Sequence, residues 1–106
     1  MRKGSIVLIP FPFTDLSGQK VRPAVVLHAA RGEDCIVAFI SSVVKKDTLA
    51  HVAISPDESN GLKTRSHIKM DKLATLQKAI VIGELGVLDD LTMKKLDDAL
   101  RHIFTL

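Results

Sequence analysis

Short apolar runs separated by turn-forming residues fill most of this sequence, and no other feature restricts its fold as strongly. They cover residues 5–10, 23–28, 35–44, 51–55 and 66–70, and another lies at residues 79–82, before Gly83 and Gly86. Runs of this length, rich in β-branched residues, are typical of β-strands. Those at 23–28 and 35–44 are continuously apolar, which indicates strands that are buried on both faces or that close around a core.

The run at residues 66–70 has a different pattern from the others. Ile68 and Met70 alternate with His67 and Lys69, which predicts a half-exposed strand with the polar pair on its outer face. The preceding segment, residues 56–61, is rich in Pro, Asp, Ser, Asn and Gly. It predicts a turn or a single helical turn.

The periodicity changes near the C-terminus, where apolar residues recur at helical spacing. These residues are Leu88, Leu91, Leu96, Ala99, Leu100, Ile103 and Phe104. The pattern predicts a helix over residues 89–104, capped at its start by Asp89 or Asp90. Strands in series followed by one helix predict a mainly β fold: a small antiparallel barrel or curled sheet, with the helix over an opening.

The chain has the size and apolar content of one domain over residues 1–106, being 46% hydrophobic and 25% charged. We expect no linker, no signal peptide and no apolar run long enough to span a bilayer. The lone Cys35 cannot form an internal disulfide, which fits a reducing cytoplasm. Because it lies within a predicted strand, we expect it to be a buried structural thiol.

The net charge of +3 is distributed unevenly along the chain. Residues 1–80 carry twelve Lys and Arg against seven Asp and Glu, whereas residues 81–106 carry three against five. A basic body with an acidic tail suits a polyanionic partner for the first part, although many proteins carry a few surplus surface lysines. With no Trp or Tyr, the chain is not expected to form a broad base-stacking platform.

Several kinds of chemistry are not supported by the sequence. His28, His51, His67 and His102 are scattered without ligand-like spacing, and Cys35 has no companion cysteine, so no metal site is expected. The glycines match neither a phosphate loop nor a dinucleotide-binding fingerprint, and there is no serine-hydrolase elbow. No cofactor is expected.

Arg22 directly precedes Pro23 at the beginning of an apolar strand. Proline biases the preceding residue to an extended conformation and begins a strand without needing a ladder hydrogen bond. A guanidinium held at such a junction can present its planar fork to a phosphate. Taken alone, the same arginine fits equally a surface residue in an ion pair.

Several motifs, in order along nearly the whole chain, resemble those of one protein family. They are GSIVLIP (residues 4–10), FTDLSG (13–18), RPAVVL (22–27), VAFISS (37–42), GL (61–62) and SHIKMDKL (66–73), followed by the helix after GVL (86–88). Together they resemble the MazF/PemK-like toxins, the ribonuclease halves of bacterial toxin–antitoxin pairs.

The resemblance implies an SH3-like barrel with a C-terminal helix, assembled as a homodimer in the cytoplasm. It implies metal-independent cleavage of single-stranded RNA, often messenger RNA at a short sequence, and neutralisation by a cognate antitoxin protein. A related toxin group with the same barrel (CcdB-like) poisons DNA gyrase instead. A non-catalytic nucleic-acid-binding barrel is the third alternative.

The family's catalytic arginine falls on Arg22, and its catalytic hydroxyl, usually threonine, falls on Ser41. The change to serine keeps the donor and removes the methyl group. Ser42 is an adjacent candidate. Because side chains alternate along a strand, only one of the two serines is expected to face the site.

Further residues are predicted to bind RNA around these two. They are Phe13, Asp15, Lys20, His28, Ser42, Lys45, Lys69 and Lys72, and Lys46 extends the same basic track. His28 and Asp15 are also candidates for a general base, because arginine is a poor resting-state base. The alternatives are core packing for Phe13, a turn role for Asp15, and ordinary solvent exposure for His28 and the lysines.

Overall fold

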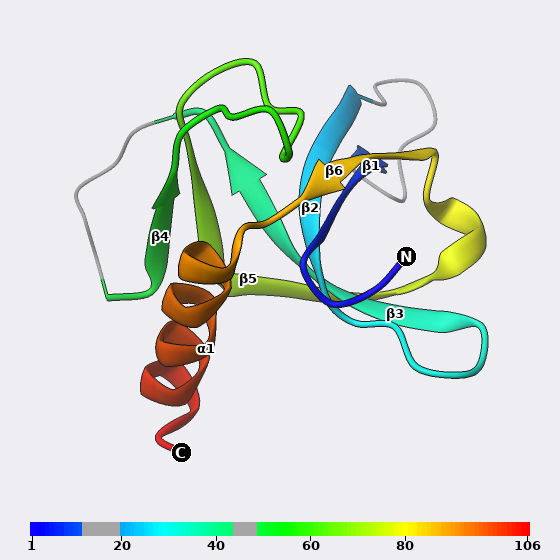
Figure 1. Ribbon diagram of the computed structural model, residues 1–106. Helices are drawn as coiled ribbons and strands as arrows, with labels where there is room; N and C mark the ends of the chain where they lie inside the picture. The colour runs from blue at the N-terminus through cyan, green and yellow to red at the C-terminus, as the bar shows by residue number, and fades with distance from the viewer. Residues whose placement is uncertain (12–19, 44–48) are drawn as a thin grey trace.

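The protein forms the predicted series of strands followed by one helix (Figure 1). The computed structural model describes residues 1–11, 20–43 and 49–106. In these ranges the elements are β1 (Ser5–Phe11), β2 (Lys20–His28), β3 (Asp34–Ser41), β4 (His51–Ile54), β5 (Ser66–Gln77), the 3₁₀ helix η1 (Lys78–Ile80), β6 (Gly83–Val87) and α1 (Asp90–Phe104). No helix in the described part of the chain is long and apolar enough to cross a membrane.

The six strands make a single antiparallel sheet in the order β4-β5-β3-β2-β1-β6. The sheet curls into a half-barrel, and α1 lies beside β4 and β5 (Figure 1). The mainly β fold, with a C-terminal helix over a curled sheet, is therefore confirmed. Asp89 caps α1 as predicted, since its carboxylate accepts a hydrogen bond of 2.7 Å from the Thr92 N–H.

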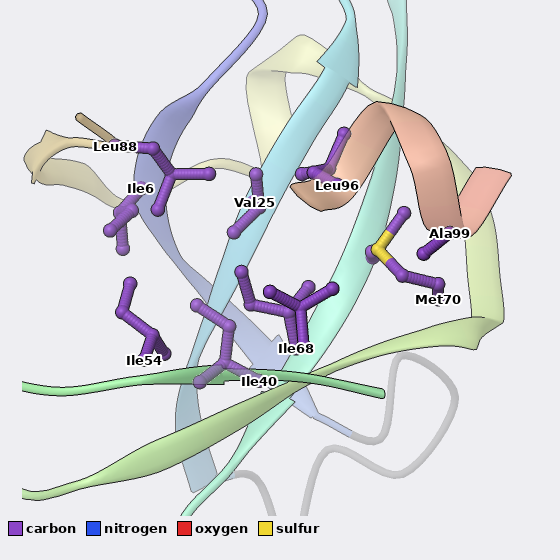
Figure 2. Close-up of a cluster of buried hydrophobic side chains, with 11 residues drawn as sticks. Ile6, Val25, Ile40, Ile54, Ile68, Met70, Leu88, Leu96 and Ala99 are labelled. Atoms are coloured by element: carbon purple, nitrogen blue, oxygen red, sulfur yellow. The ribbon is translucent and has the colours of Figure 1, made fainter. Parts of the chain in front are cut away.

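One hydrophobic cluster lies between the sheet and α1 (Figure 2). Ile6, Val25, Ile68 and Met70 of the sheet and Leu96 of the helix are completely buried in it. Complete burial of such a side chain contributes on the order of 1.5–3 kcal/mol to folding. This cluster attaches the helix to the face of the curled sheet.

A second cluster occupies the opposite face of the sheet, and it includes Val7, Ala24, Val26 and Cys35. Ala24, Val25 and Val26 are consecutive and fully buried, so β2 is covered on both faces, as its continuous apolar run predicts. Cys35 is 1% exposed, and burial raises the pKa of its thiol. Both observations agree with a structural thiol.

Strand β5 is longer and more buried than the alternation at residues 66–70 predicts. It extends over twelve residues, and His67 is only 4% exposed, so the prediction that His67 faces outward is wrong. In the sheet, β5 lies between β3 and β4. His67 is consequently flanked by a cross-strand residue on each side, Ser41 and Ala53.

The apolar run at residues 79–82 contributes to η1 rather than to a strand, and the final strand begins at Gly83. Position 86 of that strand requires a glycine, because the backbone of the 57–61 loop packs directly on it. A Cβ added at Gly86 would overlap the Ser59 carbonyl oxygen, and one at Gly61 would overlap the Leu85 carbonyl oxygen. Gly61 also has a φ of +69°, which favours glycine. The loop is therefore held tightly against β6.

Candidate functional site

A cavity of about 650 Å³ opens where β2 and β3 separate. The last paired residues of these two strands at this end are Ala24 and Phe39, beyond which the strands diverge (Figure 1). The proline at position 23 lies at this point and has no N–H to donate to a neighbouring strand. The local sequence therefore favours an open end of the sheet.

The cavity wall combines four parts of the fold. The ends of β2 and β3 supply Arg22, Pro23 and residues 39–43, and the loop before β5 supplies residues 61–64. Strand β5 adds Ser66, Lys69 and Lys72. Leu8 of β1 and Leu85 of β6 complete the wall. The lining includes apolar residues such as Leu8, Ile40 and Leu62 beside polar and charged ones. This pattern suits a ligand with both flat apolar and anionic parts.

Arg22 and Ser41 line this cavity together. Arg22 lies two residues before Ala24 on β2, and Ser41 lies two residues after Phe39 on β3, so both lie just beyond the last paired residues of the two strands. Side chains two residues apart leave a strand on the same face, so both belong to the face that carries Ala24 and Phe39. The structure thus brings together the two predicted catalytic residues from strands on either side of the opening.

The Ser41 hydroxyl oxygen accepts a hydrogen bond of 3.2 Å from the Val43 N–H. Its own proton remains available for donation, because a hydroxyl has one donor and two acceptor positions. Ser42 also lines the cavity, next to Ser41. Strand β3 ends at Ser41, and Ser42 lies in the bend that follows, where strand alternation no longer applies.

All ionisable side chains among the described lining residues are cationic. They are Arg22, Lys63, Lys69 and Lys72, with no Asp or Glu among them. No ion pair between described residues involves any of the four. Cations gathered without a carboxylate repel one another, and an anion that enters the cavity relieves this repulsion. This distribution of charge suits a negatively charged ligand.

Lys63 and Thr64 are lining residues that the sequence reading missed. A hydrogen-bonded turn positions them: buried Asn60 accepts bonds from the N–H groups of Asp57 (3.2 Å) and Leu62 (3.0 Å) and donates to the Ser55 carbonyl oxygen (2.9 Å). Their position in the sequence, between the motifs at residues 61–62 and 66–73, could have indicated that they lie near the site.

Not every predicted site residue reaches the cavity. Lys20 begins β2 two residues before Arg22 and is exposed, but it is not part of the wall. His28 ends the same strand six residues beyond Arg22, roughly 20 Å away at about 3.3 Å per residue. Phe13, Asp15, Lys45 and Lys46 lie outside the described residues.

Within the described ranges, no three His, Cys, Asp or Glu side chains gather in a way that could hold a metal ion. His51 and Asp71 form a pair, with 3.3 Å between Nε2 and Oδ1, away from the cavity wall. The functional groups of the cavity are thus one guanidinium, three ammonium groups and several hydroxyls.

The curled sheet with its C-terminal helix defines a small half-barrel protein, and its cationic cavity suits an anion. The sequence profile of the PemK-like, MazF-like toxins of type II toxin–antitoxin systems matches residues 2–104. The chain belongs to this family. No curated protein matches it significantly in sequence.

Solved structures share the fold at low sequence identity. An endoribonuclease in complex with its cognate antitoxin from a mycobacterial species is 18% identical, with a TM-score of 0.81 over 100% of this chain and 96% of that chain. The Mycobacterium tuberculosis toxin MazF-mt6 is 22% identical, with a TM-score of 0.77 over 96% and 97%. In a MazE–MazF structure from Deinococcus radiodurans, the matching chain is 18% identical, with a TM-score of 0.79 over 100% and 97%.

Proposed function

We propose that this toxin is a metal-independent endoribonuclease that cleaves single-stranded RNA at a short sequence and so inhibits translation. The observation that carries the proposal is the cavity in which Arg22 and Ser41 meet among further cations with no described carboxylate. Such a cavity suits the phosphate backbone of a single strand, and its apolar lining residues suit an unstacked base. Family membership and the endoribonuclease function of similar structures support it.

Cleavage without a metal proceeds by in-line attack of an RNA 2′-hydroxyl oxygen on the adjacent phosphorus. The O2′–P bond forms and the P–O5′ bond breaks, which leaves a 2′,3′-cyclic phosphate and a 5′-hydroxyl. Negative charge grows on the phosphoryl oxygens in the transition state, and positioned donors stabilise it. Arg22 supplies a charged bidentate donor and Ser41 a hydroxyl donor.

The lysines of the cavity take a different role in this proposal. Lys63, Lys69 and Lys72 contact phosphates on either side of the cleaved one and hold the strand in the opening. Ser42 is a further donor to the backbone. Lys20, His28, Phe13, Asp15 and Lys45 remain proposed RNA contacts beyond the cavity wall.

We further propose that the chain acts as one cytoplasmic domain, forms a homodimer and is neutralised by an antitoxin that covers the same cations. The complex of a similar endoribonuclease with its cognate antitoxin supports the binding of an antitoxin. Sedimentation at micromolar concentration tests the dimer, because the protomer mass is 11.6 kDa. A species of about twice that mass supports the dimer, and one at the protomer mass contradicts it.

The activity is tested with purified protein and a long single-stranded transcript in EDTA, followed by mapping of the cleaved sites and analysis of the product ends. We expect cleavage that leaves cyclic phosphates and 5′-hydroxyls. Ser41→Ala should slow it more than Ser42→Ala. Activity that disappears with EDTA and returns with magnesium would overturn the metal-independent mechanism, and tight gyrase binding without RNA cleavage would favour the gyrase-poison alternative.

A further inference from the structure

Buried His67 has no role in the chemistry described so far, and the hydrogen-bonding capacity of its ring is unused. It is 4% exposed, and neither of its ring nitrogens has a hydrogen-bond partner among the described residues. Nearly all buried polar side-chain atoms in proteins have such a partner, so a group like this one needs an explanation. A neutral imidazole carries one N–H donor and one acceptor nitrogen.

The sheet register shows which polar group is in reach. His67 on β5 lies directly opposite Ser41 on β3, and opposed residues of an antiparallel pair share a face with Cβ atoms about 4.5–5.5 Å apart. On the other side its partner is Ala53, which has no polar side chain. Lys69, two residues along the same strand, carries only donors.

His51 is the remaining polar neighbour, and it already has a partner. Its ring centroid is 6.5 Å from that of His67, and its Nε2 pairs with Asp71 Oδ1 at 3.3 Å. Among the described cross-strand partners of His67, Ser41 therefore provides the side-chain oxygen that can accept a hydrogen bond from its ring N–H.

We propose that His67 is a positioning residue for Ser41. When RNA occupies the cavity, a ring N–H of His67 donates to the Ser41 hydroxyl oxygen, which already accepts the Val43 N–H at 3.2 Å. Both lone pairs of the oxygen are then used, and its single proton points to the phosphoryl oxygen. The bond is not formed in this structure; catalytic hydrogen bonds are often long without ligand and tighten when it binds.

This inference rests on the proposed ribonuclease function and goes beyond it, because His67 acts through Ser41 and need not touch RNA. The test is a double-mutant cycle measured by single-turnover cleavage of a short oligonucleotide that contains a mapped site. The variants are His67→Leu, His67→Asn and Ser41→Ala, alone and combined. His102→Leu on the exposed face of α1 is the matched control and should cleave as the wild type does.

We expect His67→Leu to lower the cleavage rate about tenfold at an unchanged KM. In this variant the Ser41 hydroxyl, which donates in the transition state, is still present but is no longer held in its orientation. His67→Asn, which keeps an N–H donor, should restore the rate to within about threefold of wild type. In the Ser41→Ala background, His67→Leu should have no further effect. An equal loss in both backgrounds, or an Asn variant as slow as the Leu variant, would overturn the inference.

A second measurement needs no change at position 67 and covers the case in which His67→Leu does not fold. In ¹⁵N-labelled protein, adding a 2′-O-methyl oligonucleotide should shift the ring nitrogen signals of His67 in the wild type but not in Ser41→Ala. Unchanged signals in the wild type would contradict the proposed bond. Absence of RNA cleavage by the wild type would instead refute the ribonuclease function, so the two failures are distinguishable.

Discussion

The three lysines and one arginine of the cavity predict how strongly salt weakens RNA binding. Each phosphate neutralised on a single strand contributes about −0.7 to the slope of log K against log salt concentration. The four cavity contacts therefore contribute about −2.8 to the slope, which is a factor of about 50 in affinity between 50 and 200 mM salt. Replacing Lys63 and Lys72 with alanine removes two of them, so the slope should become less steep by about 1.4 and the fall in affinity about sevenfold smaller.

The assay is fluorescence anisotropy with a labelled 2′-O-methyl oligonucleotide, which binds but is not cleaved. Lys94→Ala with Lys95→Ala is the matched control, because it removes two exposed lysines from α1, outside the cavity. The control should keep the wild-type slope. If the cavity variant kept the wild-type slope, or if the control's slope changed as much as that of the cavity variant, RNA would not bind at this site.

Two further predictions concern stability. Asn60→Ala removes three hydrogen bonds of a buried side chain, at about 1 kcal/mol each. In urea titrations it should therefore lower the free energy of unfolding by about 3 kcal/mol. An unchanged unfolding midpoint would contradict the role of Asn60 in the turn. Hydrogen bonds from the hydroxyl and N–H of Thr92 hold the pKa of Asp89 below its ordinary value of 3.8. The stability that this carboxylate contributes is therefore present above pH 3.8 and lost as the pH falls through its lower folded pKa, so Asp89→Asn should show a smaller acid-induced loss than wild type.

Local patterns carried much of the fold prediction. The continuous apolar run around Val25 predicted a strand covered on both faces, and Asp89 followed by helical spacing predicted the capped helix. Both signals depend on neighbouring residues and backbone geometry, so a single sequence contains them. The combination of Arg22 and Ser41 came from the family resemblance, and in the structure both residues line one cavity.

Features that depend on non-local pairing were not predictable in this way. His67 alternates with apolar residues like an exposed strand residue, yet in the sheet, where β5 lies between β3 and β4, it is buried. Lys63 reaches the cavity because a hydrogen-bonded turn packs on β6, some twenty residues later in the chain. Ser42 joins the wall because β3 ends earlier than its apolar run. Each depends on contacts between distant segments.

The central claim is that the Arg22 guanidinium stabilises the transition state of RNA cleavage in this cavity. The most direct test is the single-turnover cleavage rate in EDTA of Arg22→Ala against wild type, with circular dichroism to verify that both are folded. Arg22 is exposed and forms no ion pair with another described residue, so the fold should be retained. The account predicts a loss of about a hundredfold or more. A folded Arg22→Ala protein that cleaves at the wild-type rate would contradict it.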